Sequence, residues 1–161
     1  MEPRPVRPGD TDGVLTLIGE VLGEYGCVAD LEGIDHHLRA PGPYFRERGG
    51  EFWVVEQRGQ ILATVAVMLH TNAAELKCLY VHRSIRRQGW GRRLTELAMD
   101  FARAAKRNRF VLWTDTRFED AHRLYQRLGF QRCGIRDLHD ISNTSEYGYE
   151  LLLDSRDASG Q

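Results

Sequence analysis

A nearly unbroken apolar run from Ile61 to Leu69 constrains the fold more than any other feature of the sequence. Turn-forming segments precede and follow this run, at 57–60 and 70–73. A short apolar run bounded by turns is typical of a strand that is buried on both faces. The neighbouring segments 52–56 and 75–81 also have strand-like composition. Together the three segments predict an antiparallel meander inside a larger sheet.

Helices are expected to cover this sheet. Apolar residues recur at helical spacing in three segments: 14–22, 94–105 and 120–128. Further strands are expected near Val6 and at 110–113, 130–135 and 146–153. This order predicts an α/β fold class, a single domain with a mixed, mostly antiparallel twisted sheet of about six to seven strands flanked by helices. The domain is expected over residues 1–153, followed by a polar tail at 154–161.

The segment from Glu24 to Gly50 is the least regular part of the chain. A short helix is expected over 31–38. The cluster Pro41-Gly42-Pro43 is interpreted as a helix breaker. Irregular segments of this kind often contact substrates, so this stretch and the loop near His139 are expected to meet the second substrate.

Composition excludes several classes of function. The net charge of -1 gives no general attraction to nucleic acids or to anionic membranes, so neither is expected as a partner. Three widely spaced cysteines, Cys27, Cys78 and Cys133, form no metal-ligand pattern, so no metal is expected, and free thiols suit a reducing compartment. The sequence has no signal-peptide pattern and no run long enough to span a bilayer. We therefore expect a cytoplasmic protein.

The loop Arg86–Gly91 carries the clearest functional signal. It joins the strand that ends at Val81 to an amphipathic helix, and it holds two glycines, at 89 and 91, among several arginines. Exposed N–H groups at a helix start attract anions, and glycines allow close approach to the backbone. A Walker loop is absent because no lysine is near, and Leu94 stands where a dinucleotide fingerprint needs its third glycine. The loop predicts a pyrophosphate site.

Two motifs in this order resemble those of the GCN5-related N-acetyltransferase (GNAT) family. Arg86-x-x-Gly89-x-Gly91 resembles the Q/R-x-x-G-x-G/A motif. About forty residues downstream, Ala121-His122-Arg123-Leu124-Tyr125-Gln126-Arg127-Leu128-Gly129-Phe130 resembles the A-x-x-x-Y-x-x-x-G-F segment. The flanking strand pattern extends the resemblance from about residue 5 to residue 153.

The resemblance implies an N-acetyltransferase that passes the acetyl group of acetyl-CoA, its co-substrate, to a primary amine by direct attack. In the family, pantetheine pairs with the end of the strand before the motif, which here is Leu79, Tyr80 and Val81. Backbone amides of the motif loop hold the pyrophosphate, which implies a cofactor site at Arg86, Arg87, Gln88, Gly89, Trp90, Gly91 and Arg92. The acceptor is expected to be a small molecule or an amino-terminal amine, and a homodimer is left open.

The resemblance also implies catalytic residues. The family's helix tyrosine, here Tyr125, commonly lies beside the thioester sulfur, where its hydroxyl can donate to the leaving thiolate. A core aromatic is the alternative interpretation. Some members carry a catalytic glutamate at the position of Glu75, which is therefore the candidate base. An exposed edge carboxylate is an equally good interpretation of Glu75, and Asp115, His139 and Asp140 are competing bases.

The sequence departs from the family pattern at two positions. Arg83 stands where a proline is frequent, and Phe118 stands where an asparagine often contacts pantetheine. These departures affect the pantetheine arm rather than the phosphate loop. The alternative function is a non-catalytic acyl-CoA-binding regulatory module, because binding and chemistry use different residues.

Overall fold

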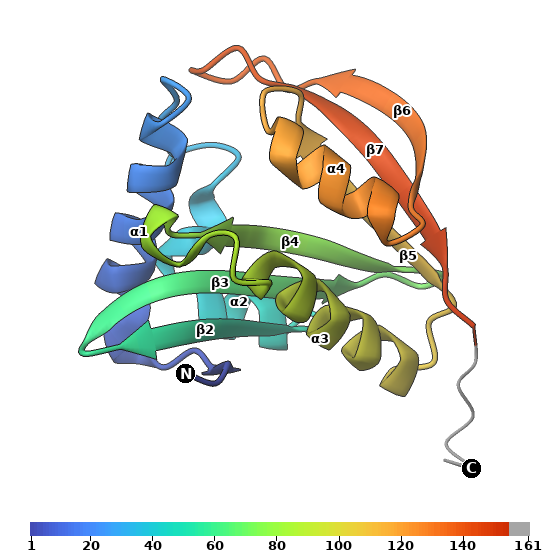
Figure 1. Ribbon diagram of the computed structural model, residues 1–161, viewed down its shortest axis with the longest axis horizontal. Coiled ribbons are helices and arrows are strands. Elements are labelled where there is room, and N and C mark those ends of the chain that lie inside the picture. The colour runs from blue at the N-terminus through green and yellow to red at the C-terminus, as the bar shows by residue number, and fades with distance from the viewer. Residues whose placement is uncertain (155–161) are drawn as a thin grey trace.

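The computed structural model describes residues 1–154 and contains one seven-stranded sheet with helices on both faces (Figure 1). The strands are β1 Arg4–Pro5, β2 Glu51–Gln57, β3 Gln60–Leu69, β4 Ala74–Val81, β5 Arg109–Asp115, β6 Gln131–Asp137 and β7 Ser145–Leu152. The α-helices are α1 Thr11–Gly23, α2 Pro41–Arg46, α3 Trp90–Ala104 and α4 Glu119–Arg127. Short 3₁₀ helices are η1 Pro8–Asp10, η2 His36–Arg39 and η3 Arg83–Ile85. The predicted fold class is confirmed, and the predicted tail lies outside the described residues except for Asp154.

The sheet has the strand order β1-β2-β3-β4-β5-β7-β6. All neighbouring strands are antiparallel except β4 and β5, which pair in parallel only from Ala74 opposite Phe110 to Leu76 opposite Leu112. The meander predicted from 52–81 is β2-β3-β4. Figure 1 shows the two groups of strands, β2-β3-β4 and β5-β7-β6, close together at the right of the view and spread apart toward the left. The sheet is therefore split between β4 and β5.

Each face of the sheet has its own apolar core. Residues 61–67 of β3 are all buried, as expected for a strand covered on both faces. One core packs under α3 and α4 and includes Leu94, Ala98 and Tyr125. The other packs under α1 and α2 and includes Leu17 and Phe45. None of the helices described is long and apolar enough to cross a membrane.

The segment between α1 and β2 differs from its prediction. The cluster Pro41-Gly42-Pro43 does not interrupt a helix but begins one, because Pro41 occupies the first turn of α2, where a missing N–H costs nothing. Phe45 is completely buried and packs against Phe52 at a ring distance of 5.7 Å, which anchors the short helix on the sheet. The helix predicted over 31–38 is instead a turn followed by η2.

Candidate active site

A bulge in β4 lies where the sheet splits. The pairing of β4 with β3 shifts by one residue between Lys77 and Tyr80, and Cys78 has a φ of 54°, which is uncommon for a residue with a side chain. The Thr64 hydroxyl donates a hydrogen bond to the Cys78 carbonyl at 2.7 Å. Beyond its first three residues β4 does not pair with β5. Residues 79–81 therefore present a strand edge, uncovered by any other described strand on that side, with which an extended ligand can pair.

The helix α3 begins directly after Gly89, whose φ of 82° lies in the left-handed region that glycine adopts without strain. The N–H of Arg93 donates to the Gly89 carbonyl at 3.0 Å, so the N–H groups of residues 90–92 have no partner within the helix. A Cβ at Gly91 would lie 3.1 Å from the Leu124 side chain, so α3 and α4 are close here. The free N–H groups and the helix dipole favour an anion.

A groove of about 750 Å³ lies at this helix start. Its walls are the end of β4, the loop before α3, the first turn of α3 and one face of α4. The predicted cofactor residues in its lining are Leu79, Tyr80, Val81, Arg86, Arg87, Gly89, Trp90, Gly91 and Arg92. Gln88 is not part of the lining. The uncovered strand edge and the helix start thus belong to one continuous groove, which suits an extended ligand with a phosphate group.

The arginines of the groove have different partners. Arg86 donates from Nη1 and Nη2 to the two carboxylate oxygens of Glu24 at 2.6 Å each, and from Nε to the Val81 carbonyl at 3.0 Å. Its guanidinium therefore fastens the loop to the end of α1. Within residues 1–154, Arg87 and Arg127 line the groove without an ion pair and can meet an anion. Arg127 is missed by the sequence analysis, although it lies inside the second motif.

A second cavity, of about 120 Å³, lies beside the groove. The two share four lining residues, Leu79, Tyr80, Phe118 and Ala121. Tyr125 lines the second cavity and is only 4% exposed. No group among the described residues forms a hydrogen bond with its hydroxyl, and burial raises its pKa, so the hydroxyl stays protonated at neutral pH. The structure thus places an unpaired proton donor close to where the groove and the cavity meet.

Two neighbouring carboxylates of this cavity have different partners. Glu146 on β7 lies opposite Asp115 on β5. Asp115 accepts hydrogen bonds from the backbone N–H, Nε and Nη2 of Arg117 at 2.9, 2.9 and 2.8 Å. Burial raises the pKa of Glu146, although an ion pair with Arg136 at 2.7 Å opposes the rise. Because its pKa is raised and it lines the cavity, Glu146 is a candidate for accepting a proton there.

The candidate base Glu75 lies elsewhere. Its carboxylate is 2.8 Å from Nε2 of His70 and 3.6 Å from Nζ of Lys77. Neither Glu75 nor His139 lines the groove or the cavity, whereas Asp140 and Lys77 line the cavity. The structure brings Tyr125 to the junction and leaves Glu75 on the part of β4 that is still paired with β5.

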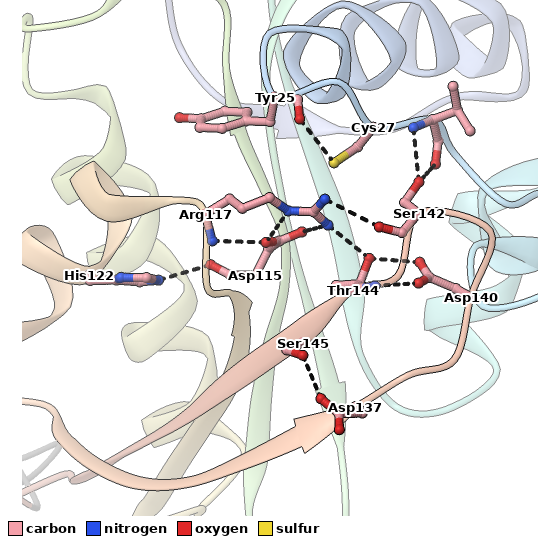
Figure 2. A network of polar contacts seen from close by, with 11 residues as sticks. Tyr25, Cys27, Asp115, Arg117, His122, Asp137, Asp140, Ser142, Thr144 and Ser145 are labelled. Carbon is pink, nitrogen blue, oxygen red and sulfur yellow. Dashed lines mark hydrogen bonds and ion pairs between the residues drawn. The ribbon is translucent and has the colours of Figure 1, made fainter.

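A polar network holds one wall of the cavity in place (Figure 2). Arg117, at its centre, binds Asp115 and donates to the Ser142 carbonyl at 3.2 Å and to the Thr144 hydroxyl at 3.1 Å. Asp140 accepts from the N–H and the hydroxyl of Thr144 at 2.6 and 2.8 Å. The Ser142 hydroxyl contacts the backbone of the segment that follows α1. The network joins three parts of the chain that are far apart in sequence.

A family model described as "Acetyltransferase (GNAT) domain" matches residues 48–132. The chain belongs to the GNAT acetyltransferase family, and the relatives it matches are named N-acetyltransferases. It is therefore an enzyme of acetyl transfer, and the alternative of a non-catalytic binding module is set aside.

The proteins similar to this chain differ in length, so the chain covers different shares of them. It is 29% identical over 128 residues to "Uncharacterized N-acetyltransferase YjgM" of Escherichia coli, covering 76% of this chain and 77% of that protein. It is 32% identical over 112 residues to "N-acetylaspartate synthetase" of Danio rerio, covering 68% of this chain but 40% of the relative. It is 34% identical over 100 residues to "N-acetyltransferase family 8 member 3" of Rattus norvegicus, covering 58% and 44%. The chain thus spans less than half the length of these last two relatives.

Solved structures agree on the fold. An acetyltransferase from Streptococcus agalactiae superposes with a TM-score of 0.80 at 24% identity, covering 94% of this chain and 98% of that one. The yncA protein of Salmonella typhimurium, a putative acetyltransferase solved with its cofactor acetyl-CoA, superposes with a TM-score of 0.73 at 18% identity, covering 98% and 96%.

Proposed function

We propose that this chain transfers the acetyl group of acetyl-CoA to a primary amine of a small molecule by direct attack. The observation that carries the proposal is the junction at Leu79 and Tyr80, where the groove at the start of α3 meets the cavity that Tyr125 lines. A groove suited to an extended phosphate-bearing ligand and a separate small cavity beside it provide places for two substrates.

In this proposal the groove holds the co-substrate. The free N–H groups of residues 90–92 and the side chains of Arg87 and Arg127 bind the phosphates. The edge of residues 79–81 pairs with the pantetheine amides. When bound, acetyl-CoA supplies a thioester carbon open to nucleophilic attack. The glycine conformation at residue 89 fits this use, because it opens the helix start to a bulky anion.

The cavity holds the amine, and its residues accept one proton and donate another. An alkyl amine is protonated at neutral pH and must lose a proton before it can attack. We assign this step to Glu146, because it lines the cavity and burial raises its pKa. The Tyr125 hydroxyl donates to the leaving sulfur. Glu75 remains a candidate base on sequence grounds alone, and substitution separates it from Glu146.

A direct assay tests the proposal. The chain is incubated with acetyl-CoA and a panel of small primary amines, amino acids and short peptides, while free CoA is followed with a thiol reagent. Acetylated amines are identified by mass spectrometry. Release of CoA that depends on a small amine, and an N-acetyl product, are expected. If acetyl-CoA binds but no amine accelerates CoA release, direct transfer to a small amine is wrong, and if only peptides do so, the acceptor class is wrong.

A further inference from the structure

We propose that the acceptor of this enzyme carries a second positive charge, which Asp35 and Asp140 bind inside the cavity that Tyr125 lines. The inference rests on the proposed function and narrows it to one class of amines, namely diamines and related dications. Asp35 belongs to the segment between α1 and η2, and Asp140 belongs to the loop between β6 and β7. Both residues line the cavity.

The charges around the cavity do not balance. Of the carboxylates in its lining, Asp115 is paired with Arg117 at 2.8 Å and Glu146 with Arg136 at 2.7 Å. The one lysine of the lining, Lys77, is 3.6 Å from Glu75, whose carboxylate lies outside the cavity. Among the described residues, no cation forms an ion pair with Asp35 or Asp140. Asp35 and Asp140 therefore have no ion-pair partner among the described residues, and only Lys77 and Arg117 act on them, over longer distances.

The surroundings of Asp35 strengthen this conclusion. Its Oδ2 accepts a hydrogen bond from the Asp30 N–H at 2.8 Å, and no other described group donates to the carboxylate. Burial raises the pKa of Asp35, and the negative charges of Asp30 and Asp140 add to the rise. A carboxylate in this situation gains the most from a cation, because the cation offsets both desolvation and like-charge repulsion.

The pKa of Asp140 is shifted in the opposite direction to that of Asp35. Burial raises the pKa of Asp140, but the hydrogen bonds from the N–H and hydroxyl of Thr144 outweigh burial, and the pKa lies below its usual range. The network of Figure 2 fixes its position through Thr144 and Arg117. Asp140 is therefore an ionised and positioned carboxylate, whereas Asp35 is the one that lacks donors.

An independent observation marks the same cavity as a ligand site. The side chain of Tyr125 is more than nine-tenths buried, lines the cavity and has a hydroxyl without a hydrogen bond to any described residue. The hydroxyl is therefore available to donate a hydrogen bond to, or accept one from, a molecule that occupies the cavity. The reacting amine and the proposed charge-binding subsite thus share one cavity.

Charge also discriminates between acceptor classes. A second ammonium or a guanidinium would neutralise the free carboxylates at short range. A neutral tail would leave them without an ion-pair partner, and a carboxylate tail would be repelled. The structure therefore favours a dication over an amino acid such as aspartate. Aspartate is the amine in the product for which the relative N-acetylaspartate synthetase is named.

Three amines of equal length test the inference. They are 1,4-diaminobutane, 1-aminobutane and 4-aminobutanoate, which carry a cationic, a neutral and an anionic end. We expect kcat/KM to be highest for the diamine, by about tenfold or more over the monoamine, beyond the statistical advantage of two equivalent amines. The acid should be the poorest acceptor. If the monoamine or the acid equals the diamine, the inference is wrong while the proposed function stands; if none is acetylated although other amines are, the inference also fails.

Isosteric variants locate the subsite. Asp35→Asn and Asp140→Asn should each lower the ratio of kcat/KM for the diamine to that for the monoamine toward one. Asp100→Asn, an exposed change on α3, is the matched control and should keep the wild-type ratio. Circular dichroism and the thermal shift with acetyl-CoA verify that each variant is folded and binds the co-substrate. A folded Asp35→Asn variant that keeps the full preference would contradict the assignment, and Asp140→Asn checks it independently.

Discussion

The groove at the start of α3 and the cavity at Tyr125 share four residues, yet they are built differently. Most of the groove comes from the continuous stretch 79–92, and its binding groups are largely backbone N–H groups and a glycine conformation. The cavity is assembled from the segment after α1, from β4 and β5, from α4 and from the loop before β7, and its polar groups are side chains.

Because of this difference, the groove and the cavity respond differently to changes in the sequence. A site made of backbone groups depends on chain conformation, so it fails when a residue changes φ and ψ. A site made of side chains depends on their identity, so it changes with a single charge or hydroxyl. Substitutions in the groove should therefore alter binding of the co-substrate, whereas substitutions in the cavity should alter turnover and the choice of acceptor.

The largest effect is expected in the groove, for Gly89→Val. A β-branched residue is strained at a φ of 82°, so the start of α3 should move and its free N–H groups should no longer converge on the phosphates. At about 100 times Kd, acetyl-CoA should stabilise the wild type by about 2.7 kcal/mol, and this shift should disappear in the variant. Differential scanning fluorimetry measures it. Gly19→Ala, on the exposed face of α1, is the control, and an undiminished shift in Gly89→Val would remove the loop from the binding site.

The next largest effect is expected in the cavity, for Tyr125→Phe. The ring and its packing are kept, and the lost hydroxyl has no hydrogen-bond partner within residues 1–154, so stability should change little. The value of kcat should fall by about 10²-fold or more if the hydroxyl protonates the leaving sulfur, while Kd for acetyl-CoA stays the same. Single-turnover kinetics and calorimetry separate the two quantities.

Tyr149→Phe provides the matched control for this change. The Tyr149 hydroxyl is buried without a hydrogen-bond partner among the described residues, but Tyr149 lines neither the groove nor the cavity. Its removal should leave kcat unchanged and raise the free energy of unfolding by about 1 kcal/mol, because an unsatisfied buried group is deleted. Equal loss of kcat in both variants would indicate a packing effect and not proton donation.

The sequence predicts the groove well because its signals are local. The residues from 79 to 92 follow one another along a strand, a loop and a helix, so their spacing in sequence is also their spacing in space. Tyr125 is predicted for a similar reason, since it lies in a short helix with its own motif. The prediction of about six to seven strands and that of the meander follow from apolar patterning, and the sheet has seven strands with a buried run at 61–67.

The sequence points to the irregular segment 24–50 and the loop near His139 as parts of the acceptor site, but not to the cavity itself, because its residues meet only in the folded chain. Glu146 becomes a neighbour of Asp115 through the pairing of β7 with β5, which no local pattern specifies. Asp35 lies in an irregular segment with no periodicity to orient it. Glu75 is on the expected strand, but it precedes the bulge at Cys78 and is still paired across to β5, so it stays outside the opening.

A comparison of Glu146→Gln with Glu75→Gln sharpens this contrast between the sequence and the structure. If Glu146 is the base, it must be ionised, so kcat/KM should fall as pH decreases through its pKa, which burial raises. Glu146→Gln should lower kcat by about 10²-fold and remove that acidic limb. Glu75→Gln should keep the limb. The opposite pattern in pH profiles of kcat/KM would make Glu75 the base.

The smallest effect is expected where the groove depends on a side chain, at the pair of Arg86 and Glu24. The side chains are about one third exposed, 34% and 31%, so the pair contributes modestly. Glu24→Gln should raise KM for acetyl-CoA by about threefold, the equivalent of ~0.7 kcal/mol, with kcat unchanged, because the loop is less firmly held to α1. Glu32→Gln, which breaks a surface pair with Arg39, should leave KM alone.

The pH dependence of stability tests whether this pair acts as described. The hydrogen bonds from Arg86 hold the pKa of Glu24 below its usual value, so its folded pKa is lower than its unfolded one. Its stabilisation is therefore present above the unfolded pKa and lost as pH falls through the folded pKa. The difference in Tm between wild type and Glu24→Gln should accordingly close in acid. A constant difference would mean that the glutamine perturbs packing, and the threefold change in KM could then not be attributed to the ion pair.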